Sequence, residues 1–222
     1  MAIAFNSQTT TNGSATSYTF SHTPAGADRI LLVHVAYKGS TNPIVSGITF
    51  NTTETLTRLT NLIQGSVMVG EVWYLLNPTA TTANIVVSTN NTGKTAIGAM
   101  TYTGVLSINT SNFASQAAQN TAPLGSITTD YADSVIIDAI AFRGLGTVLT
   151  DDANYTRRYT SSSVGNPSNG NANSASLDRS TPTTGAYSST YSLDSTQAWV
   201  TITYELQPTA DVAAGRNYGF IL

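Results

Sequence analysis

Two histidines, His22 and His34, are the side chains best suited to acid–base chemistry near neutral pH. A serine hydrolase would place one of them beside a serine and a carboxylate. The chain is rich in serine but has no Gly-x-Ser-x-Gly turn, which exposes the nucleophile in many such enzymes. His34 lies inside an apolar run and is expected to be a hydrogen-bonded core residue. His22 precedes Thr-Pro at a strand end and is expected to be exposed.

Glycoside hydrolysis would need two facing carboxylates. The sequence offers Glu71 with Glu54 or Glu205 as such a pair. Glu71 belongs to an alternating strand, so the simpler interpretation is a solvated side chain that points outward.

A calcium site would need several oxygen ligands. Asp151 and Asp152 are candidates, together with Asp130 or Asp133. The Asp-x-Asp-x-Asp-Gly loop signature is absent, so a turn cap or a solvated loop explains the pair more simply. With no visible acid, base and nucleophile set, the sequence predicts a protein that is not an enzyme and needs no cofactor or metal.

Aromatic side chains raise a different prospect, because their faces can stack on sugars. Trp73 and Trp199 lie in apolar strands and are expected in the core. Four tyrosines in polar contexts are the candidates for an exposed binding surface: Tyr155, Tyr159, Tyr187 and Tyr191.

Composition excludes several classes of function. Charged residues make up only 9% of the 222 residues, against about 25% in an average soluble domain. The net charge is −3 and only Lys38 and Lys94 are lysines, so nucleic acid is not an expected partner. Cysteine is absent, which removes disulfides and thiolate chemistry. No run of about 18 apolar residues is present, and the N-terminus does not resemble a signal peptide, so no membrane partner is expected.

The elements that would position these residues are strands, and a stretch of the chain recurs. The stretch from Ala27 to Gly39 matches the stretch from Ala132 to Gly144 without a gap, at an offset of 105 residues (133 − 28 and 144 − 39). Each copy has Ala-Asp, an apolar run, an aromatic residue, a basic residue and glycine. We interpret this as two pseudo-repeated halves, at about 17–105 and 122–208.

Apolar residues alternate with polar ones at a period of two over most of the chain, and turn residues separate these runs. The sequence therefore predicts an all-β fold, a jelly-roll-like antiparallel β-sandwich built from the two halves. The connector at about 106–120 is expected to be a strand with a loose turn, with a short helix at 115–119 as the alternative. Residues 161–173 are predicted to form a polar loop.

Residues 1–208 are assigned to a single β-sandwich domain, and residues 209–222 to a C-terminal extension. Both ends of the chain are apolar, whereas free tails are normally polar. The extension either folds back as an edge strand or forms an arm that docks on a neighbouring subunit. The candidate assembly contacts are Ile3, Phe5, Tyr218, Phe220, Ile221 and Leu222.

Four motifs carry a resemblance. They are the Ala-Asp to Gly pattern at 27–39 and 132–144, Trp-Tyr-Leu-Leu-Asn-Pro at 73–78, Ala-Met-Thr-Tyr-Thr-Gly-Val at 99–105, and the run at 197–208. Together they resemble a jelly-roll-type β-sandwich module of tailed-phage virion proteins and bacterial extracellular proteins. The resemblance covers about 17–208, and no catalytic residues are tied to it.

The leading hypothesis is therefore a non-enzymatic structural protein of the virion surface, such as a phage capsid decoration, head-fibre or tail-surface component. Its expected partners are other copies of itself, for example in a trimer, and other virion proteins, with a host-surface glycan as a further candidate. The alternative is a carbohydrate-binding or adhesive module of a bacterial extracellular protein.

Overall fold

A computed structural model describes residues 2–39, 44–144, 148–163 and 170–209. All regular secondary structure in these ranges is strand, and every strand pairing is antiparallel. The described part of the chain holds no helix of the length and apolar character that a membrane crossing requires. The predicted all-β class is therefore confirmed.

The first half of the chain forms two sheets. Sheet A has five strands in the order β1-β9-β3-β7-β6, and sheet B has four in the order β2-β8-β4-β5. Their bounds are β1 Ala4–Gly13, β2 Ser17–His22, β3 Ile30–Tyr37, β4 Val45–Phe50, β5 Glu54–Thr55, β6 Thr57–Gln64, β7 Met68–Leu76, β8 Ala83–Thr89 and β9 Thr95–Thr103. Consecutive strands β1 to β4 alternate between the two sheets, which is the connectivity of a jelly roll.

The second half forms three sheets. Sheet C has five strands in the order β10-β18-β12-β15-β14, while sheets D and E are the pairs β11-β16 and β13-β17. Their bounds are β10 Val105–Asn120, β11 Leu124–Thr129, β12 Ser134–Arg143, β13 Leu149–Thr150, β14 Thr156–Ser162, β15 Ala172–Thr181, β16 Gly185–Thr190, β17 Ser192–Leu193 and β18 Gln197–Pro208.

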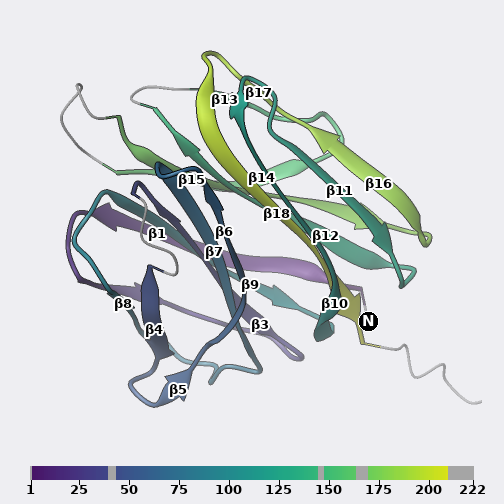
Figure 1. Cartoon of the computed structure of the whole chain (residues 1–222). Coiled ribbons are helices and arrows are strands. Elements are labelled where there is room, and N and C mark those ends of the chain that lie inside the picture. The colour runs from purple at the N-terminus through teal and green to yellow at the C-terminus, as the bar shows by residue number, and fades with distance from the viewer. Residues whose placement is uncertain (1, 40–43, 145–147, 164–169, 210–222) are drawn as a thin grey trace, which may run out of the picture.

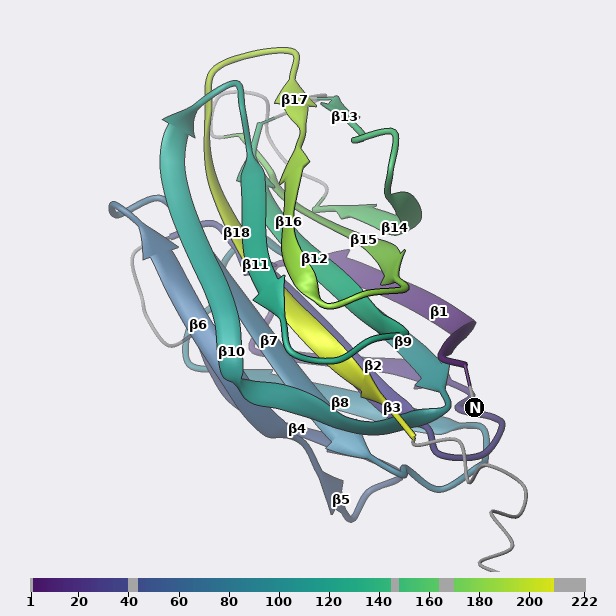
Figure 2. The same cartoon turned by 90° about the vertical axis from the view of Figure 1, so that its right-hand side faces the viewer.

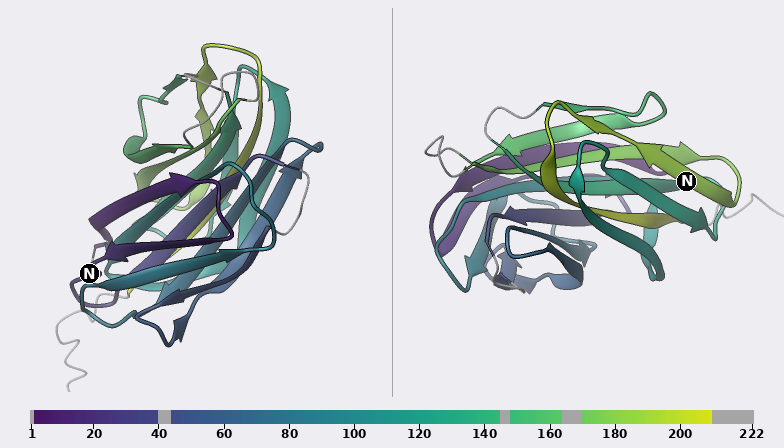
Figure 3. Two further views of the ribbon diagram at one scale, coloured as in Figure 1. Left: turned by 90° about the vertical axis from the view of Figure 1, so that its left-hand side faces the viewer. Right: turned by 45° about the horizontal axis from the view of Figure 1, so that its top comes forward.

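The sheets are stacked in layers, with B, A and C in turn and with D and E outermost (Figures 1 and 2). One apolar core lies between A and B, a second between C and the small sheets D and E, and a third between A and C. Figure 3 shows the two halves side by side from two further directions. Each half thus has an inner core of its own, and the third core joins the halves.

The central strands are apolar on both faces because each lies between two layers. All eight residues of β3 are buried. Leu32 packs in the core between A and C, and its neighbours Leu31 and Val33 pack in the core between A and B. This arrangement explains why the sequence shows a continuous apolar run here in place of strict alternation.

Of the two edge strands, β1 was not predicted, whereas β10 lies where a strand was expected, at 106–120. β1 was not expected as a strand, because its exposed and half-buried positions alternate without a matching apolar pattern. β10 is one long strand paired with β18, so the alternative of a helix at 115–119 is wrong. Ala117 and Ala118 each pack partly against a different core, which requires the two-residue period of a strand. The predicted loop at 161–173 is shorter at both ends, because β14 and β15 extend into it.

Candidate functional sites

His22 joins sheets A and B in the first half. Its Nδ1 lies 3.0 Å from Thr9 Oγ1 and its Nε2 lies 2.8 Å from Thr101 Oγ1. The residue is only 2% exposed, so the expectation of a solvent-facing histidine is wrong. Burial lowers the pKa of His22 to about 4. The ring is therefore neutral at pH 7 and serves as a hydrogen-bonded tie between the layers.

His34 lies in the core between A and C. Its Nε2 is 2.6 Å from the hydroxyl of Tyr204 on β18, and burial lowers the pKa of His34 to about 3. The prediction of a hydrogen-bonded core histidine is confirmed. Its Nδ1 has no hydrogen-bond partner, and a cavity of about 10 Å³ lies beside the ring. In a Ser-His-Asp triad a carboxylate orients the histidine, whereas the partner of His34 is the phenol hydroxyl of Tyr204.

Glu71 is buried, not solvated as expected. Its carboxylate accepts hydrogen bonds from the backbone N–H groups of Ile44 and Val45, at 2.6 and 3.1 Å, and from Trp73 Nε1 at 3.0 Å. Burial raises the pKa of Glu71, and these three donors act against that shift. A buried carboxylate needs such donors. Glu71, in sheet A, therefore holds the backbone at the start of β4, in sheet B, in place.

Glu205 anchors the turn between β11 and β12. It accepts hydrogen bonds from the N–H groups of Asp130 and Tyr131, both at 3.1 Å, and from Asn109 Nδ2. Glu205 points away from sheet A, whereas Glu71 points into the core between A and B. Glu54 accepts the N–H of Thr79. The structure therefore does not bring Glu71 and Glu205 together as a facing pair.

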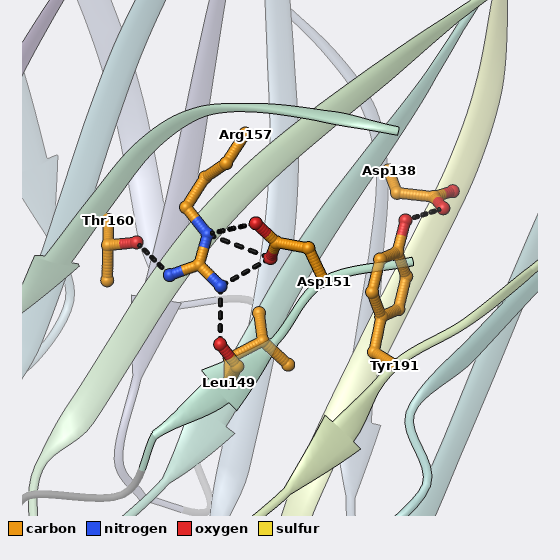
Figure 4. Close-up of polar contacts among 6 residues, drawn as sticks. All are labelled: Asp138, Leu149, Asp151, Arg157, Thr160 and Tyr191. Carbon is orange, nitrogen blue, oxygen red and sulfur yellow. Dashed lines mark hydrogen bonds and ion pairs between the residues drawn. The ribbon is translucent and has the colours of Figure 1, made fainter. Parts of the chain in front are cut away.

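Asp138, on the central strand β12, is fully buried among three hydroxyl groups. Its Oδ2 accepts hydrogen bonds from Ser189 Oγ at 2.6 Å and from the Tyr191 hydroxyl at 2.5 Å, and its Oδ1 accepts one from Thr203 Oγ1. Figure 4 shows the contact with Tyr191. Burial raises the pKa of Asp138, and the hydroxyl donors oppose that shift. This cluster was not predicted from the sequence, although a lone acid in a continuous apolar run was a visible signal.

Asp151 and Asp152 each bind a protein donor. Asp151 forms an ion pair with Arg157, whose Nε lies 2.9 Å from its Oδ1 (Figure 4). Asp152 accepts hydrogen bonds from the N–H groups of Asn154 and Thr190. These contacts lower the pKa of Asp152, while partial burial acts in the opposite direction. Within the described ranges, no group of three or more His, Asp or Glu residues is arranged to hold a metal ion.

The tyrosines proposed for surface binding are mostly inside. Tyr155 is 7% exposed, Tyr159 5% and Tyr191 3%. Tyr159 donates to or accepts from Ser174 Oγ at 2.9 Å, and its ring fills space above Gly98. Tyr187 is half-buried and has the Arg179 guanidinium 4.8 Å from its ring centre. Of the four candidates, Tyr187 alone offers partly exposed surface. Both tryptophans, Trp73 and Trp199, are buried as predicted.

The candidate assembly contacts fall into two groups. Ile3 and Phe5 pack, partly buried, against the core between A and C. Phe5 also lies edge-on to Tyr102 and beneath the guanidinium of Arg158. Tyr218, Phe220, Ile221 and Leu222 lie outside the described residues.

A cavity of about 150 Å³ lies beside the N-terminal end of β1. Its lining includes Ile3, Val135 and Pro182 together with Asp133 and Ser134. Pockets for drug-sized ligands measure roughly 300–1,000 Å³, so this cavity is too small for a substrate of that size.

The five buried ionisable residues described above, His22, His34, Glu71, Glu205 and Asp138, thus have structural roles. Each connects a strand to a neighbouring layer or holds a turn. Comparison with models of known protein families, with curated proteins and with solved structures gives no match for this chain.

Proposed function

We propose that this protein is a non-enzymatic structural component of a virus particle, a decoration, fibre or tail-surface subunit on the exterior of a tailed phage. The observation that supports this proposal is that side chains capable of acid–base chemistry are used as structural hydrogen-bond partners. His22, His34, Glu71 and Asp138 are all buried and all hold layers or loops together. Such an interior supports a rigid body and leaves none of these four groups accessible to a substrate.

The surface supports the same proposal. Charged residues are few, and hydroxyl and amide side chains occupy the exposed positions of edge strands such as β1. An exterior of this kind depends little on ion pairs, which salt screens. Copies of the chain and other virion proteins are the proposed partners, with closed symmetry such as a trimer as the usual arrangement.

The direct test is quantitative mass spectrometry of purified particles from a culture that expresses the gene. We expect a fixed copy number of this protein per copy of the major shell protein. Biotinylation of Lys38 and Lys94 on intact particles, compared with disrupted particles, then reports whether the protein faces outward. Absence from particles that retain their other structural proteins would overturn the proposal.

A carbohydrate-binding or adhesive module is the second candidate, and one observation favours it. Arg179 stacks on the partly exposed ring of Tyr187, and a guanidinium beside an aromatic face can bind a sugar ring and a carboxylate together. Glycan-array binding that is lost in Tyr187→Ala and kept in the exposed control Tyr131→Ala would support this function. No binding to any glycan at millimolar concentration would count against it.

A further inference from the structure

The two halves of the chain contain the same sheet. In sheet A the strand order is β1-β9-β3-β7-β6, and in sheet C it is β10-β18-β12-β15-β14. The two orders correspond position by position: β1 matches β10, β9 matches β18, β3 matches β12, β7 matches β15 and β6 matches β14. The matched strands also follow one another in the same order along the chain. The residues that lead into the two central strands also agree, since Asp28 and Asp133 both have positive φ angles, 47° and 55°.

The contacts between the two sheets are reciprocal. β1 lies against β14, and its counterpart β10 lies against β6, the counterpart of β14. In the same way β9 contacts β15, while β18 contacts β7. The central strands β3 and β12 contact each other. This exchange pattern is that of two copies related by a two-fold axis, as in an isologous dimer.

The interface between the sheets is closely packed. A Cβ atom at Gly98 would lie 2.0 Å from the Tyr159 ring, and one at Gly70 would lie 3.0 Å from Val200. Polar contacts also cross it, from His34 to Tyr204 and from Tyr102 to Asp178. Packing density and paired polar groups of this kind characterise stable protein–protein interfaces.

One covalent connection joins the halves in the described chain. Strands β1–β9 lie in sheets A and B and strands β10–β18 in sheets C, D and E, so the chain crosses once, at Gly104. Each half also has its own inner core, between A and B or between C and its small sheets.

We infer that the chain is a covalently linked dimer of two jelly-roll units. The five-stranded sheet of each unit is a docking face whose partner is the equivalent sheet of the other unit. The peptide connection at Gly104 then tethers two units that already bind each other through sheets A and C. This inference is independent of the proposed virion role.

The experiment cleaves the peptide connection at Gly104 in the full-length protein and tests whether the two halves stay folded and associated. A protease recognition sequence is inserted between Gly104 and Val105, and mass and circular dichroism are measured after cleavage. We expect a 1:1 complex with the mass and β-sheet signal of the intact chain. The matched control carries the same insertion at Thr92, in the turn between β8 and β9. Cleavage there cuts the chain inside the first unit, so that β9 is no longer covalently linked to β1 and β3, its partners in sheet A, and we expect the first half to unfold.

Separation of the cut halves is then tested by dilution and by Gly98→Leu, which introduces side-chain atoms where Tyr159 packs. We expect two species of about half the mass, each with a β-sheet signal. Unfolding or aggregation after cleavage at Gly104, as in the control, would overturn the inference, and so would loss of β-sheet signal when the halves separate.

A circular permutant covers the case in which the inserted site is not cleaved. It begins at Val105 and ends at Gly104, with Leu222 joined to Met1 so that residues 210–222 serve as the linker. Folding to the native mass and β-sheet signal supports the inference, because two docked units need no fixed order along the chain. Failure of this permutant to fold would contradict it.

Discussion

The hydroxyl of Tyr102 on β9 donates a hydrogen bond of 2.7 Å to Asp178 Oδ2 on β15, across the core that joins the two halves. Arg158 Nε lies 2.7 Å from the same oxygen. Burial and the nearby carboxylate raise the pKa of Tyr102, so the phenol stays protonated and remains a donor. The pair therefore couples two segments that lie 76 residues apart.

Replacing Tyr102 with phenylalanine should lower the stability of the whole chain. The change removes one donor to a buried carboxylate, and a hydrogen bond to a charged group contributes about 1.5–3 kcal/mol. Urea unfolding of Tyr102→Phe gives the measurement, with Tyr131→Phe at an exposed tyrosine as the control. Equal unfolding free energies for the two variants would show that Tyr102 does not tie the halves.

Gly98→Ala should also destabilise the protein, because the new methyl group would overlap the buried ring of Tyr159. Overpacking of this kind costs about 1–3 kcal/mol. Gly47→Ala is the matched control, since nothing lies within 4 Å of the added atom at this strand position. Combining Gly98→Ala with Tyr159→Leu should cost less than the sum of the two single changes. If the destabilisation of the double variant equals the sum of the two single variants, overlap with the Tyr159 ring is not the reason that Gly98→Ala destabilises the protein.

Acid should destabilise the fold through its two histidines. The pKa values of His22 and His34 are about 4 and about 3 in the folded protein, below the ordinary value of 6.5. Above pH 6.5 both rings are neutral whether the chain is folded or not. As the pH falls below 6.5, the unfolded chain binds protons first, so the unfolding free energy decreases until the folded-state pKa is passed. At about 1.4 kcal/mol per pH unit, the His22 contribution is on the order of 3 kcal/mol.

Urea unfolding at pH 7, 6 and 5 measures this slope. His22→Gln should be less stable at pH 7 but should lose less stability than the parent protein between pH 7 and 5. Parallel stability curves for the variant and the parent would contradict the role assigned to His22.

Asp138 should have the opposite pH dependence. Its pKa in the folded state is raised by burial, so the folded protein holds this proton at pH values where the unfolded chain releases it. Its contribution is present below the unfolded-state pKa near 3.8 and is lost as pH rises through the folded-state value. Asp138→Asn removes the titration, so the stability of the variant relative to the parent should improve from pH 4 to pH 8. A constant difference would show that Asp138 does not titrate with folding.

The C-terminal extension can be tested by solution mass. Light scattering of the full chain and of a chain ending at Thr209 should show an oligomer for the first and a monomer for the second, if residues 210–222 form an assembly arm. Thr209 is kept because its N–H donates to Gly104 O. If both forms are monomers, the hypothesis that residues 210–222 form an assembly arm is contradicted.

The central strands could be predicted from the sequence because their apolar runs are local. Strands β3 and β7 span residues 30–37 and 68–76, where the sequence is mostly apolar. β1 could not be predicted, since an edge strand with one half-buried face needs few apolar residues.

The burial of polar residues was harder to foresee, because the donors come from distant segments. His22 depends on Thr101, 79 residues away, and Glu71 on the N–H groups of Ile44 and Val45. Sequence alternation assigns a side chain to a face of a strand, but it does not show whether another layer covers that face. The tyrosines of the second half were misjudged for the same reason, since sheets C, D and E enclose Tyr155 and Tyr191.

The hydrogen bonds at Gly104 bring three parts of the chain to one place. Gly104 O accepts the N–H of Thr209, Gly104 N–H donates to Ala27 O, and the adjoining Thr103 pairs with Ala4. The first strand therefore begins, and the last strand ends, at the same pole of the molecule. A tether or fusion partner attached directly before Ala2 or directly after Thr209 would leave from this pole. The opposite pole, with the β1–β2 turn at Gly13, would then point outward and be free for display.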